Sequence, residues 1–131
     1  MPSAAFQSGT RAISVCPGPP LVVAICGEMD IQSAPELREA LLRVIRRRGP
    51  ELIIDLGGVT FLDCAGLNVL VATRRRAQLE GVWVRLVRVP PQARRMISLL
   101  RLDRAFEFGT LGSAARAGYA VRAPEVVRQR S

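Results

Sequence analysis

The chain has 131 residues, of which 49% are hydrophobic, a composition that suits one compact domain with a single core and excludes a disordered chain. It contains no His and no Lys, which excludes His-based acid–base catalysis, His-ligated metal sites and Schiff-base chemistry, so we expect no metal, no cofactor and no enzymatic activity. The net charge of +8 is carried by scattered Arg residues, with only one Tyr and one Trp to stack on bases, and this favours an acidic protein partner over direct nucleic-acid binding.

The predicted elements begin after residues 1–9, whose small, polar side chains show no periodicity and indicate disorder. Residues 11–15 and 21–26 show the alternating or continuous apolar patterns of strands. Ser33 is the predicted N-cap of a first helix, and Glu36 completes a capping box with it. The core-facing stripe of this helix comprises Leu37, Ala40, Leu41, Val44 and Ile45.

A buried strand is predicted over residues 51–56, and Gly57-Gly58 is expected to end it. Asp63 stands where the N-cap of a second helix belongs, and that helix is predicted from Cys64 to Glu80. The remaining predicted elements are a strand over 82–87, a third helix that starts at Pro90-Pro91, a short strand over 106–108 and a helical turn over 113–117.

Strands and helices alternate after the opening pair of strands, which predicts a single α/β domain with a mixed, mostly parallel sheet of about four to five strands and about four helices. We expect this domain over residues 10–118 and a basic tail over 119–131. The strands that end at Gly27 and Leu56 should finish at the same edge of the sheet. Glu28 and Asp30 are therefore expected near the Asp63 turn.

Two segments of the sequence carry a family signature. One reads D-L-x-G-V-x-F-x-D-x-x-G-L from Asp55 to Leu67, and the other reads G-E-M-D from Gly27 to Asp30 and leads into the first helix. Together they resemble the STAS domain family, named for sulfate transporters and anti-sigma factor antagonists. The resemblance implies the STAS fold and the function of a bacterial anti-sigma factor antagonist, which binds an anti-sigma factor and so releases a sigma factor.

The chain departs from this family at a regulatory position. Family members of this type usually read Asp-Ser-Ser-Gly at the start of the second helix, and an ATP-binding kinase type of anti-sigma factor phosphorylates the second Ser. Here the four residues are Asp63, Cys64, Ala65 and Gly66, so position 65 has no hydroxyl to accept phosphate. Thr60 and Ser33 are the nearby hydroxyls that remain as alternative acceptors.

The resemblance implies a partner-binding site that consists of Glu28, Asp30, Ser33, Asp63, Cys64, Ala65, Gly66 and Asn68. Several of these residues also have a structural explanation, since Asp63 and Ser33 are both predicted helix caps. Cys64 replaces a small Ser, but its place at a helix N-terminus also makes it a candidate redox-sensitive thiol. Cys26, by contrast, ends a buried strand and is expected in the core.

The predicted partner is thus an anti-sigma factor, with the ATP-binding kinase type as one candidate. The alternative is a non-phosphorylated STAS scaffold or regulatory module that binds another STAS protein or an anionic ligand, with redox control through Cys64. An enzyme with Cys64 as nucleophile is disfavoured, because no base stands near it in sequence. The short apolar runs, the lack of a signal-peptide pattern and the unpaired spacing of the Cys residues predict a cytoplasmic protein without membrane contact.

Overall fold

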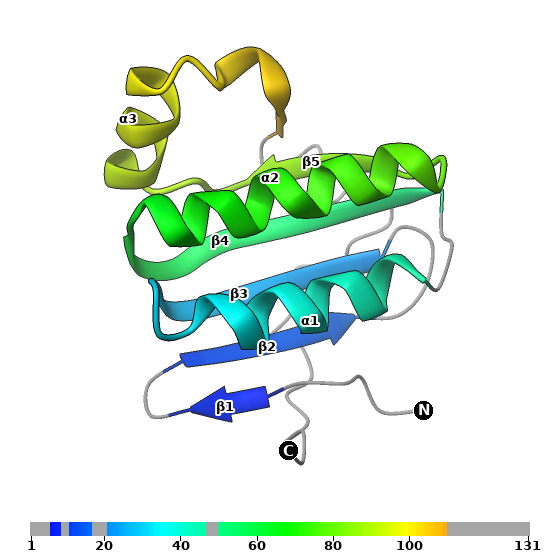
Figure 1. Ribbon diagram of the computed structural model, residues 1–131, viewed down its shortest axis with the longest axis horizontal. Helices are drawn as coiled ribbons and strands as arrows, with labels where there is room; N and C mark the ends of the chain where they lie inside the picture. Colours follow the sequence, from blue (N-terminus) through cyan, green and yellow to red (C-terminus); the bar gives the residue numbers. More distant parts are fainter. Residues whose placement is uncertain (1–5, 9–10, 17–20, 47–49, 110–131) are drawn as a thin grey trace.

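The computed structural model describes residues 6–8, 11–16, 21–46 and 50–109. These ranges form one sheet with α1 and α2 side by side across one of its faces and α3 on the β5 side of the sheet (Figure 1). The strands are β1 (Phe6–Ser8), β2 (Arg11–Cys16), β3 (Leu21–Met29), β4 (Glu51–Leu62), β5 (Trp83–Val87) and β6 (Glu107–Gly109). The helices are α1 (Ala34–Ile45), α2 (Cys64–Leu79) and α3 (Pro91–Leu99), followed by a 3-10 turn at Asp103–Ala105.

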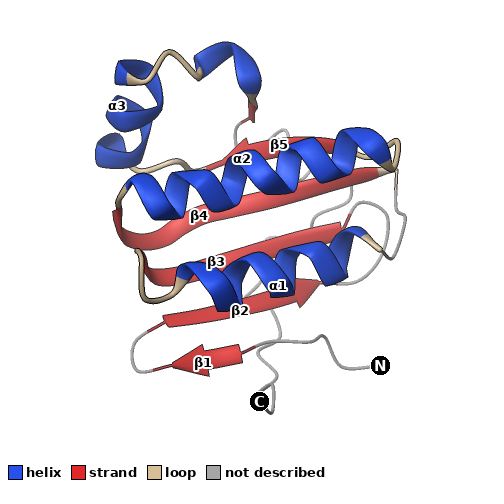
Figure 2. Cartoon of the chain, viewed as in Figure 1, coloured by secondary structure: helices blue, strands red, loops and turns tan. Residues whose placement is uncertain are grey.

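The strand order across the sheet follows the chain from β1 to β6. The pairs β1–β2 and β2–β3 are antiparallel, and the pairs from β3 to β6 are parallel (Figure 2). This confirms the predicted mixed α/β fold with parallel central strands. The described residues hold six strands, slightly more than predicted, and the helical turn predicted over 113–117 lies outside them.

The additional strand lies near the N-terminus. Phe6–Ser8 pairs with β2 through Phe6↔Ile13 and Ser8↔Arg11. The prediction of disorder over residues 1–9 is therefore wrong for these three residues. Backbone hydrogen bonds to the edge of a neighbouring strand can order a short segment that has no apolar periodicity of its own. The apolar pattern of residues 6–8 therefore could not reveal this strand.

The core lies between the sheet and the two covering helices. Inward residues of neighbouring strands pair in register, as Val23 does with Ile54 and Ile54 with Leu86, and all three are fully buried. Full burial of a side chain of this size contributes about 1.5–3 kcal/mol. The predicted apolar stripe of α1 is confirmed, since Leu37, Ala40, Leu41, Val44 and Ile45 are all buried.

Gly57-Gly58 does not end β4, contrary to the prediction. The strand continues to Leu62 and pairs with β3 as far as Met29. The register shifts between Ala24 and Cys26 and again between Gly27 and Glu28, and at each shift β4 contributes one residue more than β3. A Cβ on Gly58 would lie 2.6 Å from the Cys26 Sγ, so the glycine allows the two strands to approach at a bulge. Cys26 itself is exposed, which corrects its predicted place in the core.

A buried charge holds the connection that follows β5. Asp55 is 1% exposed, and its carboxylate accepts hydrogen bonds from Arg88 at 2.9 and 2.8 Å and from the Gly57 N–H at 2.9 Å. These three bonds satisfy a carboxylate that would otherwise be costly to bury. After this connection the chain forms α3, and the Gln92 side chain of α3 contacts Leu62 at the end of β4. None of the helices in the described part of the chain has both the length and the apolar character needed to cross a membrane.

Candidate partner-binding site

The ends of β3 and β4 meet the start of α2 at one edge of the sheet. The Asp63 N–H donates to the Met29 carbonyl oxygen at 3.2 Å, which ties the first residue before α2 to the last residue of β3. This confirms that Glu28 and Asp30 lie near the Asp63 turn, as the strand order predicted. We call the surface residues around this junction the rim; they are Glu28, Asp30, Ile31, Thr60, Phe61, Asp63, Cys64, Ala65 and Asn68.

Asp63 is the N-cap of α2, as predicted. Its Oδ1 accepts a hydrogen bond from the Gly66 N–H at 3.0 Å, an interaction that contributes about 1 kcal/mol to a typical helix. Its side chain is only partly buried, so the same carboxylate also faces the surface. One residue therefore fixes the start of α2 and places a negative charge on the rim.

Gly66 is buried beneath this turn and presents no side chain to a partner. A Cβ at this position would overlap the carbonyl oxygen of Met29. Gly66 thus permits the close approach of another backbone segment, the end of β3 in the same chain. Gly66 shapes the rim by letting α2 start directly against the end of β3.

Asp30 and Ser33 form the turn between β3 and α1. The Oδ1 of Asp30 accepts hydrogen bonds from the N–H groups of Gln32 and Ser33 at 3.0 Å each. The Ser33 hydroxyl accepts from the Asp30 N–H at 2.9 Å and donates to the Glu28 carbonyl oxygen at 2.9 Å. This network holds the Asp30 carboxylate at a fixed place on the rim.

The predicted capping box at the start of α1 is wrong. Ser33 makes no side-chain cap hydrogen bond to α1, because its hydroxyl turns inward and is 1% exposed. Asp30 instead accepts from the backbone of this turn. A buried, fully engaged Ser33 hydroxyl is poorly placed for contact with a partner or for phosphorylation, whereas Thr60 is exposed on β4.

The remaining predicted residues lie at the surface of the first turns of α2. Cys64 and Asn68 are exposed and Ala65 is half-buried, while Glu28 is half-buried at the end of β3. These residues all come to one edge of the molecule, although they are drawn from two separate segments of sequence. Their role in binding remains a proposal that rests on this placement.

Two apolar residues on the rim were not predicted. Ile31 is 75% exposed directly after Asp30, and Phe61 is 46% exposed on β4, paired in register with Glu28. Phe61 adjoins the buried Leu62, so the strand alternation places it on the opposite face. Ile31 could have been found from the sequence, because an apolar residue that belongs neither to the strand pattern nor to the helix pattern is a candidate for an exposed contact residue.

Gln92 was also missed, and it supports the rim from α3. Its amide accepts from the Leu62 N–H at 3.1 Å and donates to the Leu62 carbonyl oxygen at 2.8 Å. The register of β4 with β5 ends at Asp55↔Val87, so β5 does not reach Leu62. The Gln92 side chain thus makes the two backbone hydrogen bonds to Leu62 that a neighbouring strand would otherwise make.

The model of the STAS domain family matches residues 11–114. The chain belongs to the STAS domain family. Among curated relatives, it is 37% identical over 94 residues to the anti-sigma-F factor antagonist RsfB of Mycobacterium tuberculosis, an alignment that covers 71% of this chain and 76% of the relative. It is 34% identical over 80 residues to the anti-sigma-B factor antagonist of Bacillus subtilis, covering 61% of this chain and 72% of the relative.

The STAS fold is also evident from solved structures. The crystal structure of an anti-sigma factor antagonist from Mycobacterium paratuberculosis superposes with a TM-score of 0.73 at 33% identity, covering 86% of this chain and 97% of that one. The relatives of this chain thus include STAS domains that are named as antagonists of anti-sigma factors.

Proposed function

We propose that this STAS domain is an anti-sigma factor antagonist that binds an anti-sigma factor through the rim and so releases a sigma factor. The proposal rests on one observation: the hydrogen bond from the Asp63 N–H to the Met29 carbonyl oxygen brings the start of α2 to the end of β3, next to the turn that holds Asp30 and the exposed Ile31. The names of the chain's relatives support the same role.

The rim combines the features of a protein-binding surface. Ile31 and Phe61 offer apolar area, and the full burial of such a side chain contributes about 1.5–3 kcal/mol. Asp30 and Asp63 are already oriented by hydrogen bonds to the backbone, so a partner gains their charge without ordering them. We infer that the apolar residues supply affinity and that the carboxylates select the orientation of the partner.

Binding can be measured by titration calorimetry against each purified anti-sigma factor encoded in the genome that carries this gene. We expect one of them to bind, and Ile31→Arg to weaken binding more than tenfold, which corresponds to about 1.4 kcal/mol. Leu99→Arg is the matched control, because Leu99 on α3 is exposed to the same 75%. If the unmodified chain binds none of these factors, the proposed function is wrong.

We further propose that phosphorylation at position 65 does not control this interaction. A phosphate carries about −1.5 to −2 charges at neutral pH, and at this turn it would lie near the Asp63 carboxylate and repel a partner that fits the unmodified rim. Ala65 has no acceptor. In the presence of ATP and a kinase type of anti-sigma factor, position 65 and the affinity should stay unchanged, whereas Ala65→Ser should become phosphorylated and lose affinity.

Cys64 is the next candidate for control, because its exposed thiol lies at the same helix turn. Oxidation would add polar or charged bulk to the rim. If Cys64 acts in this way, peroxide should weaken partner binding reversibly, and Cys64→Ser should abolish the response. Phosphate on Thr60, found by mass spectrometry together with a loss of binding, would point to a displaced phosphorylation site instead.

A further inference from the structure

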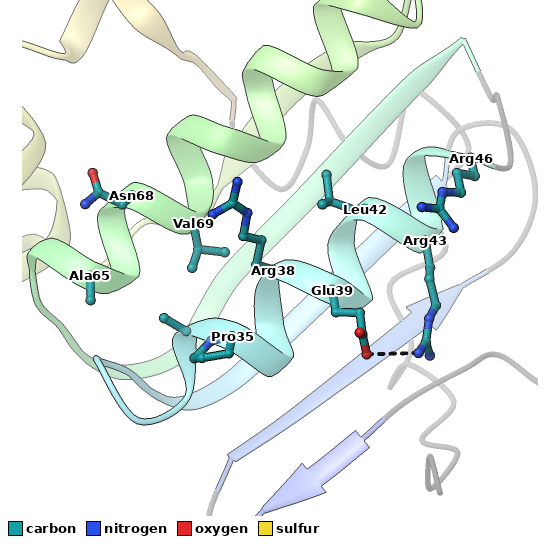
Figure 3. A pocket seen from close by; sticks show the side chains of 10 residues that line it. Pro35, Arg38, Glu39, Leu42, Arg43, Arg46, Ala65, Asn68 and Val69 are labelled. Atoms are coloured by element: carbon teal, nitrogen blue, oxygen red, sulfur yellow. Dashed lines mark hydrogen bonds and ion pairs between the residues drawn. The ribbon is translucent and has the colours of Figure 1, made fainter. Parts of the chain in front are cut away.

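A groove of about 800 Å³ lies between α1 and α2 on the face that these helices form (Figure 3). It begins at Ala65 and Asn68, which also belong to the rim, and extends along α1 to Arg46. Leu42 and Val69 point into the space between the two helices. Ala34 and Pro35 add further apolar surface at the rim end. The groove is therefore continuous with the rim and partly apolar.

The charged residues that line the groove are predominantly basic. Three arginines, Arg38, Arg43 and Arg46, stand against one carboxylate, Glu39, which gives a net charge of +2. Glu39 is already paired with Arg43 at 3.0 Å. Within the part of the chain that the structure describes, no carboxylate pairs with Arg38 or Arg46.

The helix dipole explains only part of this charge. Arg43 and Arg46 lie at the C-terminal end of α1, where a positive charge is favourable. Arg38 lies in the N-terminal half of the same helix, where the dipole gives no such benefit, and its guanidinium reaches across the groove toward Val69 (Figure 3). A carboxylate from outside the chain would give Arg38 the ion pair it lacks among the described residues.

We infer that this groove binds an acidic segment of the anti-sigma factor, with apolar side chains against Pro35 and Leu42 and carboxylates against Arg38 and Arg46. The inference rests on the proposed function and adds the chemistry of the partner to it. The rim is acidic and the groove is basic, and they share Ala65 and Asn68. A partner that covers both must therefore present opposite charges to the two surfaces, which fixes its orientation.

Charge reversal tests this inference. Arg38→Glu and Arg46→Glu should each raise the dissociation constant for the purified anti-sigma factor by about tenfold or more, because each replaces an attraction with a repulsion. Arg95→Glu on α3 is the control, since Arg95 is also exposed, lies outside the groove and changes the net charge equally. Circular dichroism verifies that each variant is folded.

The same titrations separate the inference from the proposed function. If Ile31→Arg weakens binding while Arg38→Glu and Arg46→Glu behave like Arg95→Glu, the groove is not part of the interface and the inference is overturned, although the function stands. If the unmodified chain binds no anti-sigma factor, the proposed function is wrong, and the inference that rests on it is overturned as well.

A photo-crosslinking residue at Asn68 identifies what occupies the groove. We expect it to capture a peptide of the anti-sigma factor that is rich in Asp and Glu and contains apolar residues. A crosslink to a basic peptide would overturn the inference. A crosslink to a second copy of this chain, with a doubled mass in light scattering, would also overturn it in favour of self-association.

Discussion

Gly66 is the residue whose substitution should alter the rim most directly. Because Gly66 has no side chain, α2 can start against the end of β3, and a Cβ added at this position would overlap the Met29 carbonyl oxygen. Gly66→Ala should therefore reduce the free energy of unfolding by roughly 1–3 kcal/mol through overpacking. This sign opposes intrinsic helix propensity, which favours Ala over Gly by up to ~1 kcal/mol. Urea unfolding followed by circular dichroism measures the difference.

The control for Gly66→Ala is Asn68→Ala in the same helix. Asn68 is exposed, so its replacement by a better helix former should leave the protein at least as stable. If Gly66→Ala were as stable as the unmodified chain, α2 and β3 could not approach as closely as the structure shows.

Asp63 has two roles that substitution can separate. Asp63→Ala removes the hydrogen bond to the Gly66 N–H and should cost about 1 kcal/mol of stability. Asp63→Asn keeps a capping oxygen and should cost little, but it removes the negative charge from the rim. Calorimetric titration of both variants with the anti-sigma factor shows whether the charge contributes to binding; equal affinity of Asp63→Asn and the unmodified chain would limit Asp63 to its capping role.

At the scale of elements, the sequence predicted the helices better than the ends of the strands. The apolar stripe of α1 and the Asp63 cap of α2 are local patterns, and both are confirmed. The continuation of β4 through Gly57-Gly58 depends on bulges in β4 itself and on the close approach of Gly58 to Cys26 in β3. Contacts between distant segments leave no periodic signal in either segment. The sequence pattern therefore predicted that the glycine pair ends the strand, whereas in the fold the pair permits close packing of two strands.

The candidate site shows the same division. The meeting of Asp30 with the Asp63 turn follows from the order of parallel strands, and it was predicted. The inward turn of Ser33 and the support from Gln92 depend on which backbone groups lack a partner in the folded chain. Sequence patterns do not reveal these unpaired groups, because they arise where a neighbouring strand ends.

Gln92 gives α3 a role in holding the rim. Its amide makes two hydrogen bonds to the Leu62 backbone, one residue before the α2 cap. Gln92→Met keeps a similar volume but leaves the Leu62 N–H and carbonyl unpaired, at a cost of about 1–3 kcal/mol for each buried polar group. We expect faster hydrogen exchange at the Leu62 amide and weaker partner binding.

The control for this element is a second position on α3 whose side chain is exposed. Arg95→Met changes an exposed residue of the same helix and should leave the exchange rate at Leu62 unaltered. Slow exchange at Leu62 in Gln92→Met would show that α3 does not support the rim.

The whole molecule has a net charge of +8, but the rim is acidic, because it contains Glu28, Asp30 and Asp63 and no basic residue. The groove beside the rim is basic, and Arg74–Arg76 lie toward the far end of α2, where Arg76 pairs with Glu80 at 3.3 Å. At a rise of about 1.5 Å per residue, Arg75 lies roughly 16 Å along the helix from Cys64. Charges at that distance act on an approaching acidic partner before contact rather than within it.

This separation predicts that distant and local charges change different rate constants. The association rate should fall as salt rises, because the Debye length shrinks from about 10 Å at 0.1 M to about 3 Å at 1 M. Arg75→Glu, at an exposed position, should lower the association rate and leave dissociation unchanged, whereas Arg38→Glu in the groove should mainly accelerate dissociation. Surface plasmon resonance at several salt concentrations measures both constants. An association rate that is independent of salt would show that residues 74–76 do not steer the partner and are simply solvated helix positions. An unchanged dissociation rate in Arg38→Glu would remove Arg38 from the interface.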